Sequence, residues 1–159
     1  MYIDSSEAEV APAAHDLSAA WAQIAAVVAA VDATLGKWLT DNYGIGLTEY
    51  RAALHLSRST DHELRINDLA HSVGLNQSSA TRLVGRMEDK GLAFRDTCPE
   101  DGRGVYAVIT DKGLSSAEEI REPYEEKIRE LLKSTAEQYP HLNLSGLDYS
   151  FKTISELAV

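Results

Sequence analysis

Hydrophobic residues in the N-terminal part of the chain recur in alternating steps of four and three positions, which indicates a helix with one continuous apolar stripe. Gly44 and Gly46 predict where this helix ends. Most such stripes pack against the core of their own domain, but the length of this one leaves room for a helix from another chain. The stripe consists of Leu17, Trp21, Ile24, Val28, Val31, Leu35 and Trp38.

The C-terminal part repeats this spacing twice, and turn residues at 139–140 and 143–146 predict a break between two helices. Pro123 falls inside the first of them, where proline either kinks a helix or marks the first turn of a new one. The two stripes are Ile120, Tyr124, Ile128 and Leu131, followed by Leu147, Phe151, Ile154 and Ala158. Long amphipathic helices are therefore predicted at both ends of the chain.

The middle of the chain has shorter elements. Thr48 is predicted to cap a second helix, and Asn67 to cap a short third helix that Gly74 ends in a left-handed conformation. Asn76 is predicted to cap the next helix, which runs to residue 90. Two short helices joined by a tight glycine turn form the helix-turn-helix arrangement.

Residues 92–95 and 105–109 have the composition of strands, and the segment between them is rich in turn residues. A β-hairpin directly after a helix-turn-helix is a wing, and Thr110 is predicted to start the helix that follows it. The fold class predicted from these elements is mainly α (α+β), a winged helix-turn-helix with long N- and C-terminal helices.

The helix that follows Asn76 has a polar face whose residue types suit DNA. If Ala80, Leu83, Val84 and Met87 face the core, the polar residues between them face outward. A helix that recognises duplex DNA places its N-terminal residues against base edges in the major groove, where glutamine pairs with adenine and arginine with guanine. The alternative is a solvated polar face without a ligand. The candidate DNA-binding residues are Asn76, Gln77, Ser78, Ser79, Thr81, Arg82 and Arg86.

The predicted hairpin carries a second candidate contact to DNA. Arg103 lies at its tip between two glycines, and a lone arginine on an extended loop suits insertion into a narrow minor groove. Asp101 is placed to brace that guanidinium from within the loop. The alternative is an ordinary solvated charge in a turn.

The stretch from Leu47 to Gly113 resembles the MarR family of bacterial winged-helix transcription regulators. The matching segments are 47–48, 67–70, 76–84 with Met87, 90–92, Arg95, 99–103 and 109–113. The resemblance implies a homodimer with a helical dimerisation layer at 12–46 and 114–159 and a DNA-binding lobe at 47–113. Two lobes would dock on a pseudo-palindromic operator of double-stranded DNA, with recognition helices about 34–36 Å apart. The wing departs from the family pattern at Cys98 and Gly102, which predicts a more flexible and less basic loop.

The resemblance also implies a small-molecule pocket between the dimerisation layer and the DNA-binding lobe. An aromatic lining with one arginine would suit an aromatic carboxylate or a phenol. It is equally consistent with the sequence that these side chains simply pack the helix junction. The candidate lining residues are Trp38, Tyr43, Tyr50, Arg51 and His55.

The charge of the chain at first argues against nucleic acid as a partner, because 15 Lys and Arg face 25 Asp and Glu over 159 residues, for a net −10. Its distribution changes that inference. Residues 1–50 carry −6 and residues 113–159 carry −4, so residues 51–112 are neutral overall. Within them, 76–87 has two arginines and no acid. We therefore expect low non-specific affinity for DNA and a modest dependence on salt.

Other chemistries are not indicated. A single cysteine, Cys98, excludes an internal disulfide and a Cys-rich zinc site. The five histidines lack the spacing of a paired metal site, and no catalytic triad or phosphate loop stands out, so no metal, no cofactor and no enzyme is predicted. No apolar run approaches ~18 residues, and the acidic N-terminus is unlike a signal peptide, so we expect a cytoplasmic protein without a membrane span.

The sequence therefore favours a homodimeric, sequence-specific regulator of transcription, with a repressor of nearby genes that a small ligand releases as the leading form. One alternative is a helical dimeric module that keeps the winged-helix shape but binds protein. Another is a thiol-based redox regulator acting through Cys98, although acids at 96, 100 and 101 should disfavour its reactive thiolate.

Overall fold

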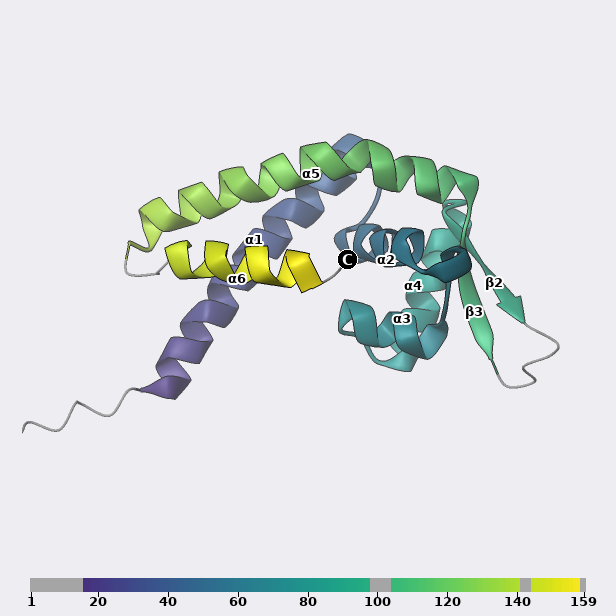
Figure 1. The fold of residues 1–159 in the computed structure, drawn as a ribbon, viewed down its shortest axis with the longest axis horizontal. Coiled ribbons are helices and arrows are strands. Elements are labelled where there is room, and N and C mark those ends of the chain that lie inside the picture. The colour runs from purple at the N-terminus through teal and green to yellow at the C-terminus, as the bar shows by residue number, and fades with distance from the viewer. Residues whose placement is uncertain (1–15, 98–103, 141–143, 158–159) are drawn as a thin grey trace, which may run out of the picture.

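The computed structural model describes residues 16–97, 104–140 and 144–157, and it is mainly helical with one small antiparallel sheet (Figure 1). The fold class predicted from the sequence is confirmed. The elements in chain order are α1 (Leu17–Tyr43), α2 (Leu47–Arg58), the 3₁₀ turn η1 (Thr60–His62), β1 (Glu63–Arg65), α3 (Ile66–Val73), α4 (Gln77–Asp89), β2 (Ala93–Thr97), β3 (Val105–Ile109), α5 (Asp111–Gln138) and α6 (Leu144–Leu157).

The glycine and asparagine signals around the helix-turn-helix act as predicted. Gly44 and Gly74 end α1 and α3 with φ of 67° and 71°, a left-handed conformation that glycine adopts without steric cost. Asn76 caps α4, because its Oδ1 accepts the backbone N–H of Ser79 at 2.8 Å. Two helices thus meet at a tight turn whose geometry follows from local sequence.

Two predicted caps are wrong. Helix α2 begins at Leu47 with Gly46 as its N-cap, so Thr48 lies inside the first turn. The carboxylate of Glu49, the third residue of the helix, accepts the N–H of Gly46 at 2.9 Å, and Gly46 has no side chain to accept an N–H of the first turn. Helix α3 begins at Ile66 with Arg65 as its N-cap, so Asn67 is also inside its helix. The reason is that α3 follows directly from strand β1, which sets the junction earlier.

The sheet has the order β1-β3-β2, and both pairs are antiparallel. Strands β2 and β3 form the predicted wing, although β2 runs to Thr97 rather than to Arg95. Strand β1 was not predicted. Its three residues are too few for a pattern of alternating burial, and its pairing with β3, Leu64 against Ala107, joins segments far apart in the sequence.

The C-terminal helices decide between the two alternatives for Pro123 and differ from the prediction in one place. Helix α5 runs through Pro123 as one helix, so no new helix starts there, and its curved course is visible in Figure 1. Helix α6 begins at Leu144, inside the segment 143–146 that was expected to be a break. The break is thus shorter than its turn-forming residues suggested.

The core lies where α2, α3, α4, the sheet and the first half of α5 meet. Figure 1 shows these elements gathered at one end of the molecule, with α1 and α5 extending away from it. Side chains from α2, α3, α4 and α5 are almost fully removed from solvent here, including Leu56, Leu69, Leu83, Met87 and Ile120. This packing holds α4 against α2 and leaves its opposite face exposed.

Candidate nucleic-acid interface

The exposed face of α4 carries most of the predicted DNA-binding residues. Ala80, Leu83, Val84 and Met87 are buried on the other face, as the apolar spacing predicted. Ser79 is half-buried, and its Oγ lies 3.3 Å from a terminal nitrogen of Arg82. The exposed candidates are Asn76, Gln77, Ser78, Thr81, Arg82 and Arg86.

Asp101, Arg103 and Cys98 lie outside the residues that the structure describes. The base of the wing is described, and it stands beside α4 and α3 (Figure 1).

A hollow of about 230 Å³ separates α4 from the base of the wing. Gln77 and Thr81 of α4 line one side of it, and Arg65 and Arg95 line others. The guanidinium of Arg65 lies 5.5 Å from the centre of the Tyr106 ring, within the range of a cation–π contact. The hollow therefore combines two amide- or hydroxyl-bearing side chains of α4 with two arginines.

Neither Arg65 nor Arg95 was among the predicted site residues. Arg95 lies on β2 and forms an exposed ion pair with Glu88 of α4, at 2.7 Å. Its own backbone N–H also donates to that carboxylate, at 2.8 Å. Because strand β1 was not predicted, Arg65 could not be placed beside α4 from the sequence. From the sequence, Arg95 belongs only to the segments that resemble the MarR family, and it has no predicted role in binding.

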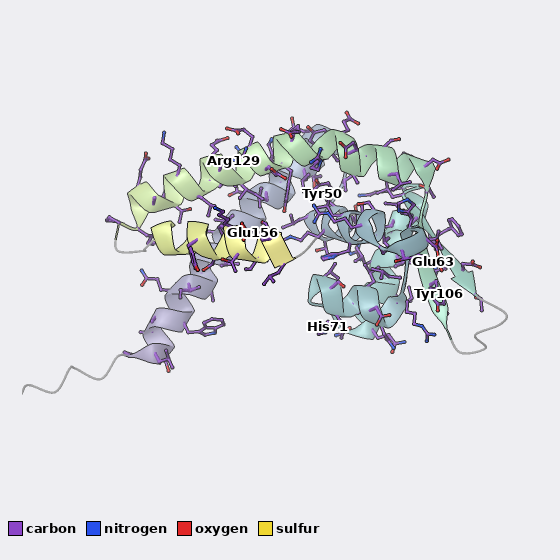
Figure 2. All side chains as sticks on the ribbon, in the orientation of Figure 1. Tyr50, Glu63, His71, Tyr106, Arg129 and Glu156 are labelled. Carbon is purple, nitrogen blue, oxygen red and sulfur yellow. The ribbon has the colours of Figure 1, made fainter. Side chains whose placement is uncertain are left out.

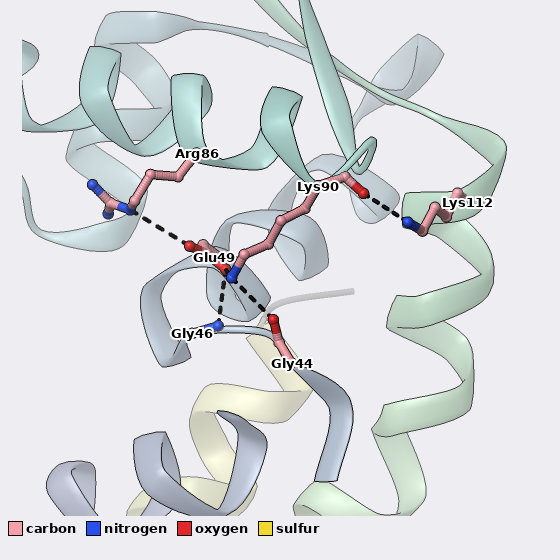
Figure 3. Close-up of polar contacts among 6 residues, drawn as sticks. All are labelled: Gly44, Gly46, Glu49, Arg86, Lys90 and Lys112. Carbon is pink, nitrogen blue, oxygen red and sulfur yellow. Dashed lines mark hydrogen bonds and ion pairs between the residues drawn. The ribbon is translucent and has the colours of Figure 1, made fainter. Parts of the chain in front are cut away.

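A buried carboxylate lies at the other end of α4. Glu49 is only 5% exposed, and it receives Nζ of Lys90 at 2.7 Å and faces Nε of Arg86 at 3.5 Å (Figure 3). Burial alone raises the pKa of Glu49. The hydrogen bonds from Lys90 and from the N–H of Gly46, with the charges of Lys90 and Arg86, outweigh burial and hold this pKa below its usual value.

The lowered pKa predicts how stability depends on pH. A carboxyl group with a lower pKa in the folded state contributes stability above its unfolded-state pKa, and this contribution is lost as the pH falls through the folded-state value. We expect the wild type to be more stable than Glu49→Gln at neutral pH, and this difference to shrink below about pH 4.5. Urea unfolding across a pH series measures it. A difference that stays constant down to about pH 3 would contradict the assignment.

Four of the five predicted pocket residues make contacts, and these contacts lie at separate places. Trp38 and Tyr43 meet edge to face, with ring centres 5.5 Å apart. Tyr50 lies between α2 and α5, with its ring centre 4.6 Å from that of Tyr124 (Figure 2). The cavities described around α4 and α5 are lined by other residues. None of the five predicted pocket residues lines one of these cavities.

Two groups in this region have unusual polar environments. Arg51 of α2 donates to both carboxylate oxygens of Asp32 on α1, at 2.8 and 3.1 Å, and these hydrogen bonds raise the pKa of Arg51. The hydroxyl of Tyr50 is buried without a hydrogen-bond partner among the described residues, and burial raises the pKa of Tyr50. His55 is exposed. Arg51 therefore ties α1 to α2, and Tyr50 leaves one buried polar atom unsatisfied.

Large apolar side chains lie exposed on α1 and α6. On α1, Trp21 is 69% and Val28 is 54% exposed, whereas Leu35 of the same stripe is buried. On α6, Phe151 and Ile154 are also exposed. The N-terminal half of the α1 stripe is therefore not covered by the described residues of this chain.

Helix α1 is long and apolar enough to cross a membrane, judged by length and composition. The prediction of no membrane span rested on the lack of a long unbroken apolar run, whereas this helix passes on its mean hydropathy. Many alanines make the helix apolar, although polar residues such as Gln23 and Asp32 interrupt every long apolar run. Length and composition do not distinguish such a helix from one that packs against other helices.

Within the described part of the chain, no group of three or more His, Cys, Asp or Glu side chains could hold a metal ion. The predicted DNA-binding residues on α4 and the polar side chains around the hollow carry hydroxyl, amide and guanidinium groups.

Comparison with known proteins points in one direction. A family model described as MarR family matches residues 43–104. The transcriptional repressor MprA of Escherichia coli strain K12 is 26% identical over 112 residues, which are 66% of this chain and 64% of MprA. The match thus spans less than two thirds of that protein.

Solved structures extend the likeness over most of the chain. The crystal structure of AbsC, a MarR family transcriptional regulator from Streptomyces coelicolor, is 26% identical, with a TM-score of 0.70, over 92% of this chain and 97% of AbsC. Another MarR family regulator from the same organism, solved in complex with DNA, has a TM-score of 0.71 at 20% identity, over 89% of this chain and 84% of that one. At that identity the second likeness concerns the fold alone.

Proposed function

Since the chain belongs to the MarR family of transcriptional regulators, we propose that it binds double-stranded DNA as a homodimer and represses nearby genes until a small ligand releases it. It would act in the cytoplasm as a regulator rather than as an enzyme. The relatives that it resembles are themselves named as transcriptional regulators, one of them as a repressor and one solved with DNA.

The observation that carries the proposal is the exposed face of α4. Gln77, Thr81 and Arg82 project from the N-terminal half of a helix whose other face is buried. A helix docked in the major groove reads base edges with such side chains. Arg65 and Arg95, on the far side of the hollow, would face the phosphates beside the groove.

Dimerisation is supported by the uncovered apolar faces of α1 and α6. Soluble monomers rarely expose large contiguous apolar patches, and protein–protein interaction sites are among the features that such patches mark. Because the exposed half of the α1 stripe continues the buried half, a second helix packed along it would extend the same core. We therefore propose that residues 12–46 and 114–159 form the dimerisation layer and residues 47–113 the DNA-binding lobe.

Release by a ligand is proposed at the junction of α1, α2 and α5. The unsatisfied hydroxyl of Tyr50 and the guanidinium of Arg51 could bind the oxygen atoms of a phenol or an aromatic carboxylate. Arg51 would have to exchange Asp32 for the ligand, which would loosen the tie between α1 and α2. Trp38, Tyr43 and His55 remain candidates for the lining of this pocket.

Replacing Arg82 by alanine tests the role of α4. We expect a loss of about 5- to 150-fold in affinity for the operator, and a relaxed preference at one base pair of each half-site. Titration of labelled duplexes with single base-pair changes measures both effects. Arg129→Ala is the matched control, because Arg129 lies on α5 away from α4 (Figure 2).

An Arg82→Ala protein that kept the operator affinity and the base preference of the wild type would remove Arg82 from the interface. A uniform loss of affinity across all sequences would instead assign Arg82 to a phosphate.

A further inference from the structure

Glu49, Arg86 and Lys90, together with the backbone of Gly44 and Gly46, form a polar cluster that we call the Glu49 cluster (Figure 3). Lys90 donates both to the Glu49 carboxylate and to the carbonyl of Gly44, at 2.7 and 3.0 Å. The cluster joins two parts of the fold, because Gly44 and Gly46 belong to the turn between α1 and α2, and Lys90 is the C-cap of α4.

A second contact joins the same end of α4 to α5. Nζ of Lys112, in the first turn of α5, donates to the carbonyl of Lys90 at 2.7 Å. The C-terminal end of the proposed recognition helix is therefore bound by polar contacts to the start of α5 and to the end of α1. Helix α1 belongs to the proposed dimerisation layer, and α5 enters that layer at residue 114, directly after the turn that carries Lys112.

We propose that Glu49 is a positioning residue for DNA recognition, which sets the direction of α4 relative to α1 and holds Arg86 in place by its Nε. The inference rests on the proposed function. Figure 3 shows the two terminal nitrogens of Arg86 on the side away from Glu49, where they can meet a phosphate. Glu49 does not touch DNA in this arrangement and acts through α4 and Arg86.

A small change at this end of α4 has a large effect at the other end. The helix has 13 residues and is about 20 Å long at ~1.5 Å per residue, so a turn of about 5° at its C-terminal end moves its N-terminal end by nearly 2 Å. Hydrogen bonds to base edges tolerate only a few tenths of an ångström. The base-reading residues at the N-terminal end therefore depend on how the C-terminal end is bound.

The proposed positioning role of Glu49 requires the negative charge of its side chain as well as its shape. Its Oε2 accepts from the N–H of Gly46 and from Nζ of Lys90, and its Oε1 lies 3.5 Å from Nε of Arg86 in an ion pair. A glutamine at this position keeps one acceptor oxygen and introduces an NH₂ group opposite cationic partners. Glu49→Gln therefore removes the attraction that orders Lys90 and Arg86 while it preserves the volume of the side chain.

The test compares binding to two duplexes of equal length, one carrying the operator selected by the wild type and one with the operator scrambled. For Glu49→Gln we expect operator affinity to fall about tenfold. Affinity for the scrambled duplex should stay equal or rise, because a negative charge near the DNA has been removed. A purely structural defect would lower both affinities together, in proportion to the folded fraction.

The matched control is Glu118→Gln, which makes the same change in an exposed ion pair with Arg121 on α5. It should keep the operator preference of the wild type. The second variant is Lys90→Met, which breaks the same cluster from α4 and keeps the apolar stem of the side chain. We expect it to lose preference for the operator as Glu49→Gln does.

Two results would overturn the inference while leaving the proposed function intact. One is that Glu49→Gln or Lys90→Met prefers the operator over the scrambled duplex as strongly as the wild type does. The other is failure of both variants to fold, measured by circular dichroism, since it would assign the cluster to stability alone. A wild type that prefers no DNA sequence would remove the proposed function and, with it, this inference.

Discussion

A variant in which Trp21 and Val28 are both replaced by glutamate is expected to be a monomer and to bind the operator at least ~100-fold more weakly than the wild type. Both side chains lie exposed on the part of the α1 stripe that the residues described in the structure leave uncovered. In a dimer they would be buried, and burying an unpaired carboxylate is costly enough to prevent association. A monomer has only one DNA-binding lobe, so it loses the gain in operator affinity that a dimer has from binding two half-sites at once.

Sedimentation at a series of protein concentrations measures the association, and titration of an operator duplex measures the affinity. Ala26→Glu with Ala33→Glu is the matched control, because it adds the same charge to exposed positions on the opposite face of α1. The control should remain dimeric. A stripe variant that is dimeric and binds the operator normally would show that this face of α1 is not the dimer interface.

Gly113→Ala is expected to destabilise the protein by about 3 kcal/mol. Gly113 lies in the first turn of α5, packed against the residue that precedes β2. A Cβ atom there would come within 2.2 Å of the carbonyl oxygen of Leu92 and 2.6 Å of Cγ1 of Ile109. The first of these contacts is with backbone, so relief requires α5 to move away from the wing.

Gly85→Ala makes the same chemical change, but we expect it to have the opposite effect on stability. A Cβ at Gly85 has no neighbour within 4 Å, and the residue lies in the interior of α4. Because alanine favours helix over glycine by roughly 0.5–1 kcal/mol, this variant should be more stable than the wild type. Urea unfolding at one protein concentration compares the two, since the stability of a dimer depends on concentration. A Gly113→Ala protein within about 1 kcal/mol of the wild type would contradict the packing described.

The parts of the fold that the sequence predicts well are those with strong local signals. Gly74 and Asn76 act on their own neighbours, so the turn between α3 and α4 follows from a few residues. The buried face of α4 follows from the spacing of its apolar residues. The resemblance to a family, which rests on these same segments, then supplied the overall arrangement.

The parts that the sequence does not predict depend on contacts between distant segments. Strand β1 exists because it pairs with β3, and Arg65 joins the hollow only through that pairing. Glu49 precedes Lys90 by 41 residues, so its role in binding α4 has no local signature. A glutamate in the first turn of a helix is ordinarily explained by the helix dipole.

In the candidate site too, some features follow from local sequence and others depend on contacts between distant segments. The α4 residues were predicted as a group because helical periodicity places them on one face. Arg86 lies on that face as well, but its contact with Glu49 gives it a second partner that periodicity cannot indicate. Composition was the least informative property, because a net charge of −10 conceals a neutral central segment.

Selection of bound duplexes from a random pool tests the central claim most directly. We expect the wild type to enrich a pseudo-palindromic sequence whose half-sites lie about 10–10.5 base pairs apart, one turn of B-DNA, with two chains bound per site. Enrichment of nothing, together with no retardation of any duplex at low salt, would contradict the account. That result would favour a dimeric module that keeps the winged-helix shape and binds protein.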